Sequence, residues 1–204
     1  PDDSDVLQKL ELTLNQIMHT HRHLQRRLNE YLPFVQERAI LHLMRDGVND
    51  DVLSRQIGEI EILSGHRAFA VAIAQIDRPS DFLLKYPLKD RPRIQDALCK
   101  LMEELFEPVT PAMPIVLDPM RTAVIIGWKT PQPDDAEQQM LRIADEFRRL
   151  AATHFHFPTS VTISRIREGV EGVHIGYQKA LELLNRRMLL GQDVTIFEDA
   201  GGLA

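Results

Sequence analysis

The chain has 204 residues, of which 44% are hydrophobic and 26% charged, a composition typical of a globular protein. Its net charge of −6 argues against a nucleic-acid or anionic-membrane surface in this segment, because phosphate binding needs clustered Lys and Arg. A single cysteine, Cys99, excludes an intramolecular disulfide and a cysteine-rich zinc site, and no apolar run approaches the roughly 18 residues that span a bilayer.

Residues 7–35 carry a seam of residues spaced alternately three and four apart, without a slip. Over about four heptads this is the a/d pattern of a parallel coiled coil, so we expect a homodimer through this helix. His21 falls in the seam, where a lone polar residue usually sets register; we favour that role over a metal site with His19 and His23. The seam is Leu7, Leu10, Leu14, Ile17, His21, Leu24, Leu28, Tyr31 and Val35.

Two further helices are expected after the coil. Pro33 should kink or end the first helix, because proline lacks a donor N–H and clashes with the preceding turn. A second helix is expected over 34–45, and a third from a cap at Asn49 or Asp50 to about residue 63. We interpret this part as a helical connector.

The remainder predicts an α/β (α+β) domain. The nearly continuous apolar run at 68–76 is typical of a buried central strand, and the polar, proline-containing stretch 77–92 is expected to be a loop. The first six elements from residue 68 have the β-α-β-β-α-β order of ferredoxin-like folds. Helices are expected near 94–105, 140–150 and 173–188, and further strands near 113–117, 122–129, 161–166 and 194–197.

Several motifs resemble a GGDEF-like domain. The sequence Val-Thr-Ile-Ser at 161–164, the pair Ala180-Leu181 and the turn at Gly191 are similar to the C-terminal half of that family. The run AFAVAIAQID is similar to its first strand, which ends here at Asp77. The resemblance implies the family's sheet for this part of the chain.

The segment 34–63 resembles the helical lead-in of one subgroup of this family. In that subgroup a degenerate GGDEF-like domain lies between a membrane-anchored sensor and a C-terminal AraC-type helix-turn-helix domain. The resemblance covers about residues 34–199 and implies a cytoplasmic regulatory segment of a bacterial transcription regulator.

The hairpin departs from the pattern of active diguanylate cyclases, which carry Gly-Gly-Asp/Glu-Glu-Phe. There the glycines admit the guanine nucleotide and the acidic pair holds metal for phosphoryl transfer. Residues 118–121 read Asp-Pro-Met-Arg instead, and Ser164 is followed by Arg165 where the family usually has glycine. Asp77 matches the metal aspartate of the first strand, but one or two lone carboxylates do not fix two magnesium ions. We expect no enzyme activity, no metal and no cofactor.

Two groups of polar residues are candidate sites. Asp77 and Asp81, with Arg78 and Lys85, follow the first strand, where ligands bind in many α/β sheets; a solvated loop is the favoured alternative. The pair His154 and His156 is interpreted as a surface pair rather than a metal site. The candidate vestigial or ligand site consists of Asp77, Asp81, Asp118 and Arg121.

The expected organisation is a signalling coil at 1–35, a connector at 36–65, a degenerate GGDEF-like domain at 66–199 and a tail at 200–204 of a longer protein. Its expected function is signal relay: a change in the coil alters how two DNA-binding domains outside this chain are presented. DNA is thus a partner only through a domain absent here, and no membrane contact is expected within this segment. The alternative is a module that senses a nucleotide or small metabolite; an active cyclase with a non-standard metal set ranks third.

Overall fold

The computed structural model describes residues 32–130 and 135–198, and within them it leaves the side chains of 188–190 undescribed. The chain divides into two compact units, residues 1–38 and 39–204. The domain boundaries inferred from the sequence stay predictions.

The predicted coiled coil falls almost wholly beyond the described residues. Val35 is the one seam residue described; it lies in helical residues 32–46 and is 42% exposed. Pro33 also lies within these helical residues. The coil therefore remains a prediction. Outside the described part lie Leu7, Leu10, Leu14, Ile17, His19, His21, His23, Leu24, Leu28 and Tyr31.

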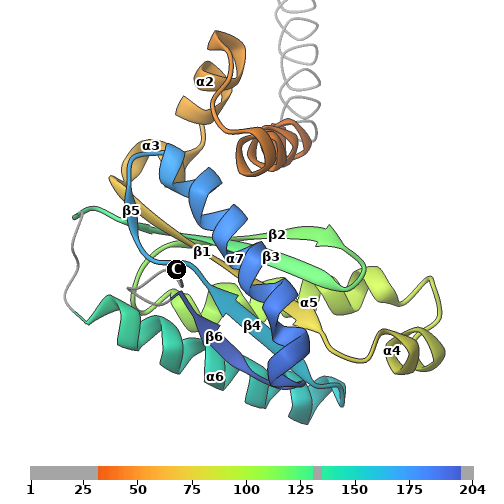
Figure 1. The fold of residues 1–204 in the computed structure, drawn as a ribbon. Helices are drawn as coiled ribbons and strands as arrows, with labels where there is room; N and C mark the ends of the chain where they lie inside the picture. The colour runs from red at the N-terminus through yellow and green to blue at the C-terminus, as the bar shows by residue number, and fades with distance from the viewer. Residues whose placement is uncertain (1–31, 131–134, 199–204) are drawn as a thin grey trace, which may run out of the picture. The chain divides into compact units, whose positions relative to one another are not determined.

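The larger unit is built on a sheet of six described strands (Figure 1). Their order is β2-β3-β1-β4-β6, and β5 pairs with β1 outside this path. All neighbours are antiparallel except β4 and β6, which are parallel. The first four strands have the order expected of a ferredoxin-like sheet, which confirms the predicted fold class. The strands are β1 (Ala68–Ile76), β2 (Ala112–Asp118), β3 (Arg121–Trp128), β4 (Thr159–Ile163), β5 (Arg167–Glu168) and β6 (Thr195–Phe197).

Helices cover both faces of this sheet (Figure 1). One face packs against α5 and α6, and the other packs against α7 together with the helical connector. No helix among the described residues is long and apolar enough to cross a bilayer. The helices, besides helical residues 32–46, are α2 (Asp51–Gly58), α3 (Glu61–Gly65), α4 (Pro79–Lys85), α5 (Arg91–Phe106), α6 (Ala136–Phe155) and α7 (Glu171–Leu190).

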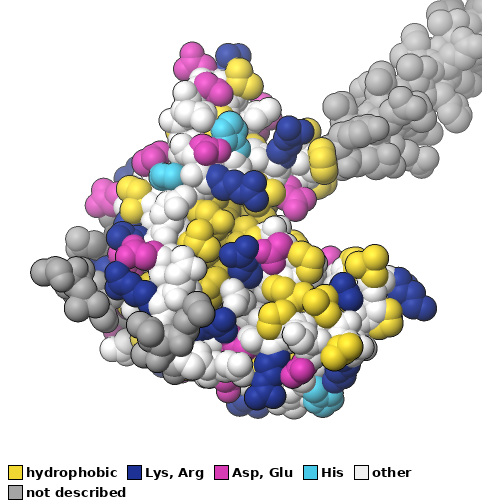
Figure 2. Space-filling model, turned by 45° about the vertical axis from the view of Figure 1, so that its right-hand side comes forward, with side chains coloured by type: hydrophobic (Ala, Val, Ile, Leu, Met, Phe, Trp, Pro, Cys, Tyr) yellow, Lys and Arg dark blue, Asp and Glu magenta, His cyan; other side chains and the backbone are white. Residues whose placement is uncertain are grey.

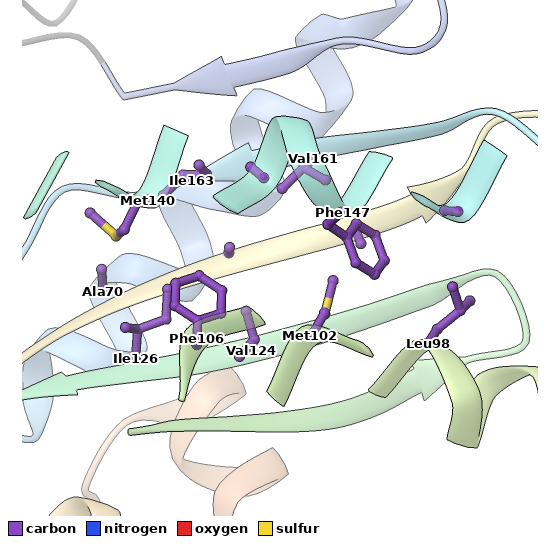
Figure 3. Close-up of a cluster of buried hydrophobic side chains, with 14 of the residues drawn as sticks. Ala70, Leu98, Met102, Phe106, Val124, Ile126, Met140, Phe147, Val161 and Ile163 are labelled. Atoms are coloured by element: carbon purple, nitrogen blue, oxygen red, sulfur yellow. The ribbon is translucent and has the colours of Figure 1, made fainter. Parts of the chain in front are cut away.

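The central strand β1 separates two hydrophobic cores, because successive side chains of a strand point to opposite faces. Its alanines, such as Ala70 and Ala72, face α5 and α6 and leave room for Phe106, Met140 and Phe147 (Figure 3). The other face of β1 is lined by Phe69, Val71 and Ile73, which pack with the connector and α7. Both faces are buried, as the continuous apolar run predicted.

Two sequence expectations for the helices are wrong. The stretch after β1 contains α4 rather than only a loop; Pro79 occupies the start of this helix, where its missing N–H is not needed, and Phe82 is buried. The predicted third helix is two helices, α2 and α3, separated by extended backbone at Ile60. Asp50 does cap α2, accepting a hydrogen bond from Leu53 N at 2.6 Å.

Candidate functional site

Asp77, at the end of β1, is buried and held by three partners. Its Oδ2 accepts hydrogen bonds from Ser160 Oγ at 2.9 Å and from Asp193 N at 2.7 Å. Its Oδ1 forms an ion pair with the guanidinium of Arg187, from the last turns of α7. Burial lowers the pKa of Arg187. The carboxylate is therefore enclosed, and a solvated loop is the wrong description of this position.

The turn between α7 and β6 brings these partners together. Backbone φ is +101° at Gly191 and +58° at Asp193, so the chain reverses sharply and directs the Asp193 N–H at Asp77. Arg148 from α6 fastens the same turn: it pairs with Asp193 Oδ1 at 2.9 Å and donates to Thr195 Oγ1 at 3.1 Å. Two arginines from different helices thus fix the position of β6.

The hairpin carboxylate is also satisfied within the chain. Asp118 Oδ1 accepts from Met120 N at 2.8 Å, and Oδ2 accepts from Arg121 Nε at 2.7 Å. Asp118 pairs with Arg121 across the β2–β3 turn, as the predicted tight hairpin requires. Arg121 therefore neutralises the carboxylate of Asp118.

The predicted site residues do not converge on one ligand. Asp81 is exposed and pairs with Arg78 at 3.9 Å, and Arg78 donates to Gln192 Oε1 at 3.0 Å. Lys85 lies over the ring of Tyr86 at 5.3 Å. Three separate pairs thus stand where one site was considered: Asp77 with Arg187, Asp81 with Arg78, and Asp118 with Arg121.

At this edge of the sheet the described residues form no metal-binding cluster, and the cavity beside the hairpin is small. Within residues 32–130 and 135–198, no group of three or more His, Cys, Asp or Glu side chains could hold a metal ion. The cavity beside the hairpin has a volume of about 10 Å³ and is lined in part by Met120, Gln95 and Thr159, space for about one water. His154 and His156 are both exposed on either side of the end of α6. Asp77 and Asp118 are each paired with an arginine, so they do not fit a pair of magnesium ions.

Sequence reasoning missed Arg187, Ser160 and Arg148. The two arginines lie on polar stretches of their helices, where solvated side chains are the ordinary expectation, and Ser160 belongs to a strand predicted one residue later. Only the fold brings them to Asp77. No local signal in the sequence could have found them.

A second set of contacts joins the helical connector to α7. His174 Nδ1 lies 3.0 Å from Met44 O, and Gln178 Nε2 donates to Arg45 O at 3.2 Å. These carbonyls belong to the last turn of helical residues 32–46, which has no intrahelical donors left for them. Glu171 at the start of α7 accepts from Val48 N at 3.4 Å. Side chains of α7 therefore cap the end of the connector helix.

The sheet order and the hairpin together define an α+β domain of the GGDEF type without its acidic signature. The family model described as GGDEF-like domain matches residues 49–185, so the chain belongs to this family. No curated protein sequence matches the chain at the significance required in these comparisons.

The chain is similar to solved structures of GGDEF and GGEEF domains and of a diguanylate cyclase. The active GGEEF domain of a diguanylate cyclase from Vibrio cholerae has a TM-score of 0.53 and 9% identity, over 69% of this chain and 96% of that one. The GGDEF domain of DgcB from Caulobacter crescentus in complex with c-di-GMP has a TM-score of 0.47 and 14% identity, over 76% and 95%. Diguanylate cyclase SiaD from Pseudomonas aeruginosa, in complex with its activator SiaC, has a TM-score of 0.48 and 17% identity, over 96% and 81%. The first of these likenesses supports the fold, and at 9% identity it shows no activity.

Proposed function

We propose that this chain is a non-catalytic signal-relay segment of a bacterial AraC-type transcription regulator. The observation that carries the proposal is the ion pair between Asp77 and Arg187, which occupies the carboxylate that a cyclase would offer to metal. Phosphoryl transfer depends on metal ions and charge stabilisation. Arg121 forms an ion pair with Asp118, so this second carboxylate is also not free to bind a metal ion. The segment works in the cytoplasm, and a further domain contacts DNA.

Helix α7 is the element through which the relay operates. Its first turns cap the connector helix through His174 and Gln178, and its last turns hold Asp77 through Arg187. A shift of the connector helix breaks or strains these caps, because packed helices move between discrete arrangements. The α7–β6 turn beyond Arg187 then passes the shift to the C-terminal end of the domain.

Dimerisation through the coil is tested by light scattering after gel filtration of residues 1–204. The wild-type chain should have twice the 23.4 kDa mass of one copy, and Leu14→Ser with Leu24→Ser should reduce the mass toward one copy. Leu12→Ser is the matched control, because Leu12 falls outside the seam. A dimer unchanged by the seam variant would place the interface elsewhere and remove the basis of the relay.

Catalysis is tested separately. Incubation with GTP and Mg²⁺ or Mn²⁺ should yield no cyclic dinucleotide, and product formation would refute the non-catalytic assignment.

Small-molecule sensing is the alternative function. It predicts a rise in melting temperature with GTP or a cyclic dinucleotide, since a ligand that binds only the folded state stabilises it by about 2.7 kcal/mol at a hundredfold excess over Kd.

A further inference from the structure

The segment around α4 exposes large apolar side chains next to cations. Leu84 is 87% exposed and Leu88 is 76% exposed, the highest values among the large hydrophobic residues of the described part. We call residues 83–89 the leucine turn. In the space-filling view, hydrophobic and basic side chains gather toward the end of the molecule that carries α4 (Figure 2).

The leucine turn is held firmly, so its leucines are displayed on a fixed base. Phe82 is buried, and its ring lies 5.4 Å from that of Phe157 in an edge contact. Tyr86 donates to Phe155 O at 2.8 Å. Arg91 donates to Tyr86 O at 3.0 Å and to a second carbonyl of the turn at 3.2 Å. A surface with this much internal support is preorganised for contact, which reduces the entropy lost on association.

Charge around the leucine turn is opposite to that of the whole chain. Residues 85–93 contain Lys85, Lys89, Arg91 and Arg93 against one carboxylate, Asp90, whereas the chain carries a net charge of −6. Arg91 and Arg93 lie in the first turn of α5, where the helix dipole favours anions rather than cations. An acidic partner at this end of α5 would offset both the local excess of positive charge and the unfavourable interaction of the two arginines with the helix dipole.

The other end of α5 carries the complementary surface. A groove of about 440 Å³ lies there, with Pro111 and Ala112 as apolar lining and an acidic rim. The helix dipole is again opposed, because these anions lie at the C-terminal end of α5. The rim is formed by Glu103, Glu104 and Glu107, with Lys100 as the single cation lining the groove.

We infer that the leucine turn of one copy docks into the acidic groove of a second copy. Leu84 and Leu88 would cover the apolar lining of the groove, and Lys85 and Lys89 would face its glutamates. The two surfaces lie at opposite ends of the same helix, so the contact is head-to-tail and can join further copies. It is distinct from the predicted coil, which is two-fold.

Charge reversal on each surface tests this inference. Lys85→Glu with Lys89→Glu and, separately, Glu103→Lys with Glu107→Lys should each weaken association about tenfold or more, because like charges then face each other. Mixing the two variants should restore association, since an acidic turn meets a basic groove. The readout is sedimentation velocity of residues 1–204 over a range of concentrations at low ionic strength, where such charges are least screened.

Growth in mass with concentration reports the head-to-tail contact, whereas the mass at the lowest concentration reports the coil, so the two can fail separately. Glu59→Lys with Glu61→Lys is the matched control for the groove variant: both glutamates are exposed and outside α5, and the net charge changes in the same direction by the same amount. Leu84→Ser should abolish the increase in mass with concentration, and its circular dichroism spectrum should be unchanged because the fold is retained. The inference would be overturned if the wild-type mass did not depend on concentration. It would also be overturned if the control lost as much association as the groove variant, or if mixing the two charge-reversed variants did not restore association. So would Leu84-dependent binding to phosphatidylserine–phosphatidylcholine vesicles by a chain that does not self-associate.

Discussion

Replacing Arg187 by methionine should strongly destabilise the domain. The Asp77 side chain is fully buried and the Arg187 side chain is 13% exposed, so the variant leaves a buried carboxylate without a charge partner. Loss of one member of a buried ion pair costs about 3–5 kcal/mol. For a chain of this size each kcal/mol lowers Tm by about 2–4 °C, so a fall of about 6–20 °C is expected. Thermal and urea unfolding, followed by circular dichroism at 222 nm, measure both quantities.

Arg186→Met is the matched control, because Arg186 is the adjacent position on α7 and its pair with Glu182 is about half exposed. Exposed pairs contribute little, so its unfolding free energy should change by less than about 1 kcal/mol. The double variant Asp77→Asn with Arg187→Met removes both charges and should recover part of the loss. If Arg187→Met alone lowered the free energy of unfolding by less than about 1 kcal/mol, the claim that Arg187 neutralises a buried Asp77 carboxylate would be refuted.

Two further substitutions probe the packing of α7 and the C-terminal strand. Gly176→Ala should lower the free energy of unfolding by about 1–3 kcal/mol in urea titrations, because a Cβ there would lie 2.8 Å from Ser164 Oγ; Gly58→Ala, with no atom within 4 Å, should be neutral or stabilising. Burial alone would raise the pKa of Glu198, but hydrogen bonds from Arg167 and from the Arg165 N–H lower it overall. Glu198 should therefore stabilise the fold above its unfolded pKa of about 4.3, and this contribution should be lost as pH falls through the lower folded value. Glu198→Gln should reduce stability at pH 7 and flatten its acid dependence; an unchanged pH profile would contradict this role.

The sequence predicted β1 within its observed bounds, because nine nearly continuous apolar residues leave few alternatives to a buried strand. It also predicted the turn at Asp118 and Arg121, where proline at the second turn position favours a tight hairpin. Local signals of this kind depend on neighbouring residues alone, so they can be recognised without the fold.

Helix α4 was missed for the opposite reason. Seven residues that begin at Pro79 are too short to form a helix from propensity, and Phe82 anchors them in a core that includes Phe157, which follows α6. Arg187, the partner of Asp77, was missed for the same reason, because most of the domain's sequence separates the two residues. Elements stabilised by distant contacts carry no periodicity that would predict them.

The outer strands of the sheet limit how this protein can associate. Strand β2 lies at one edge and contains Pro114, which has no N–H to offer an incoming chain, and β6 at the other edge spans only three residues. An exposed strand edge is a template for strand addition, fibril growth and capture of extended peptides, and proline and shortness both suppress these reactions. The protein can therefore reach high local concentrations without its sheet continuing from one copy to the next. Contacts between copies through the described strands are therefore expected from side chains rather than from strand pairing.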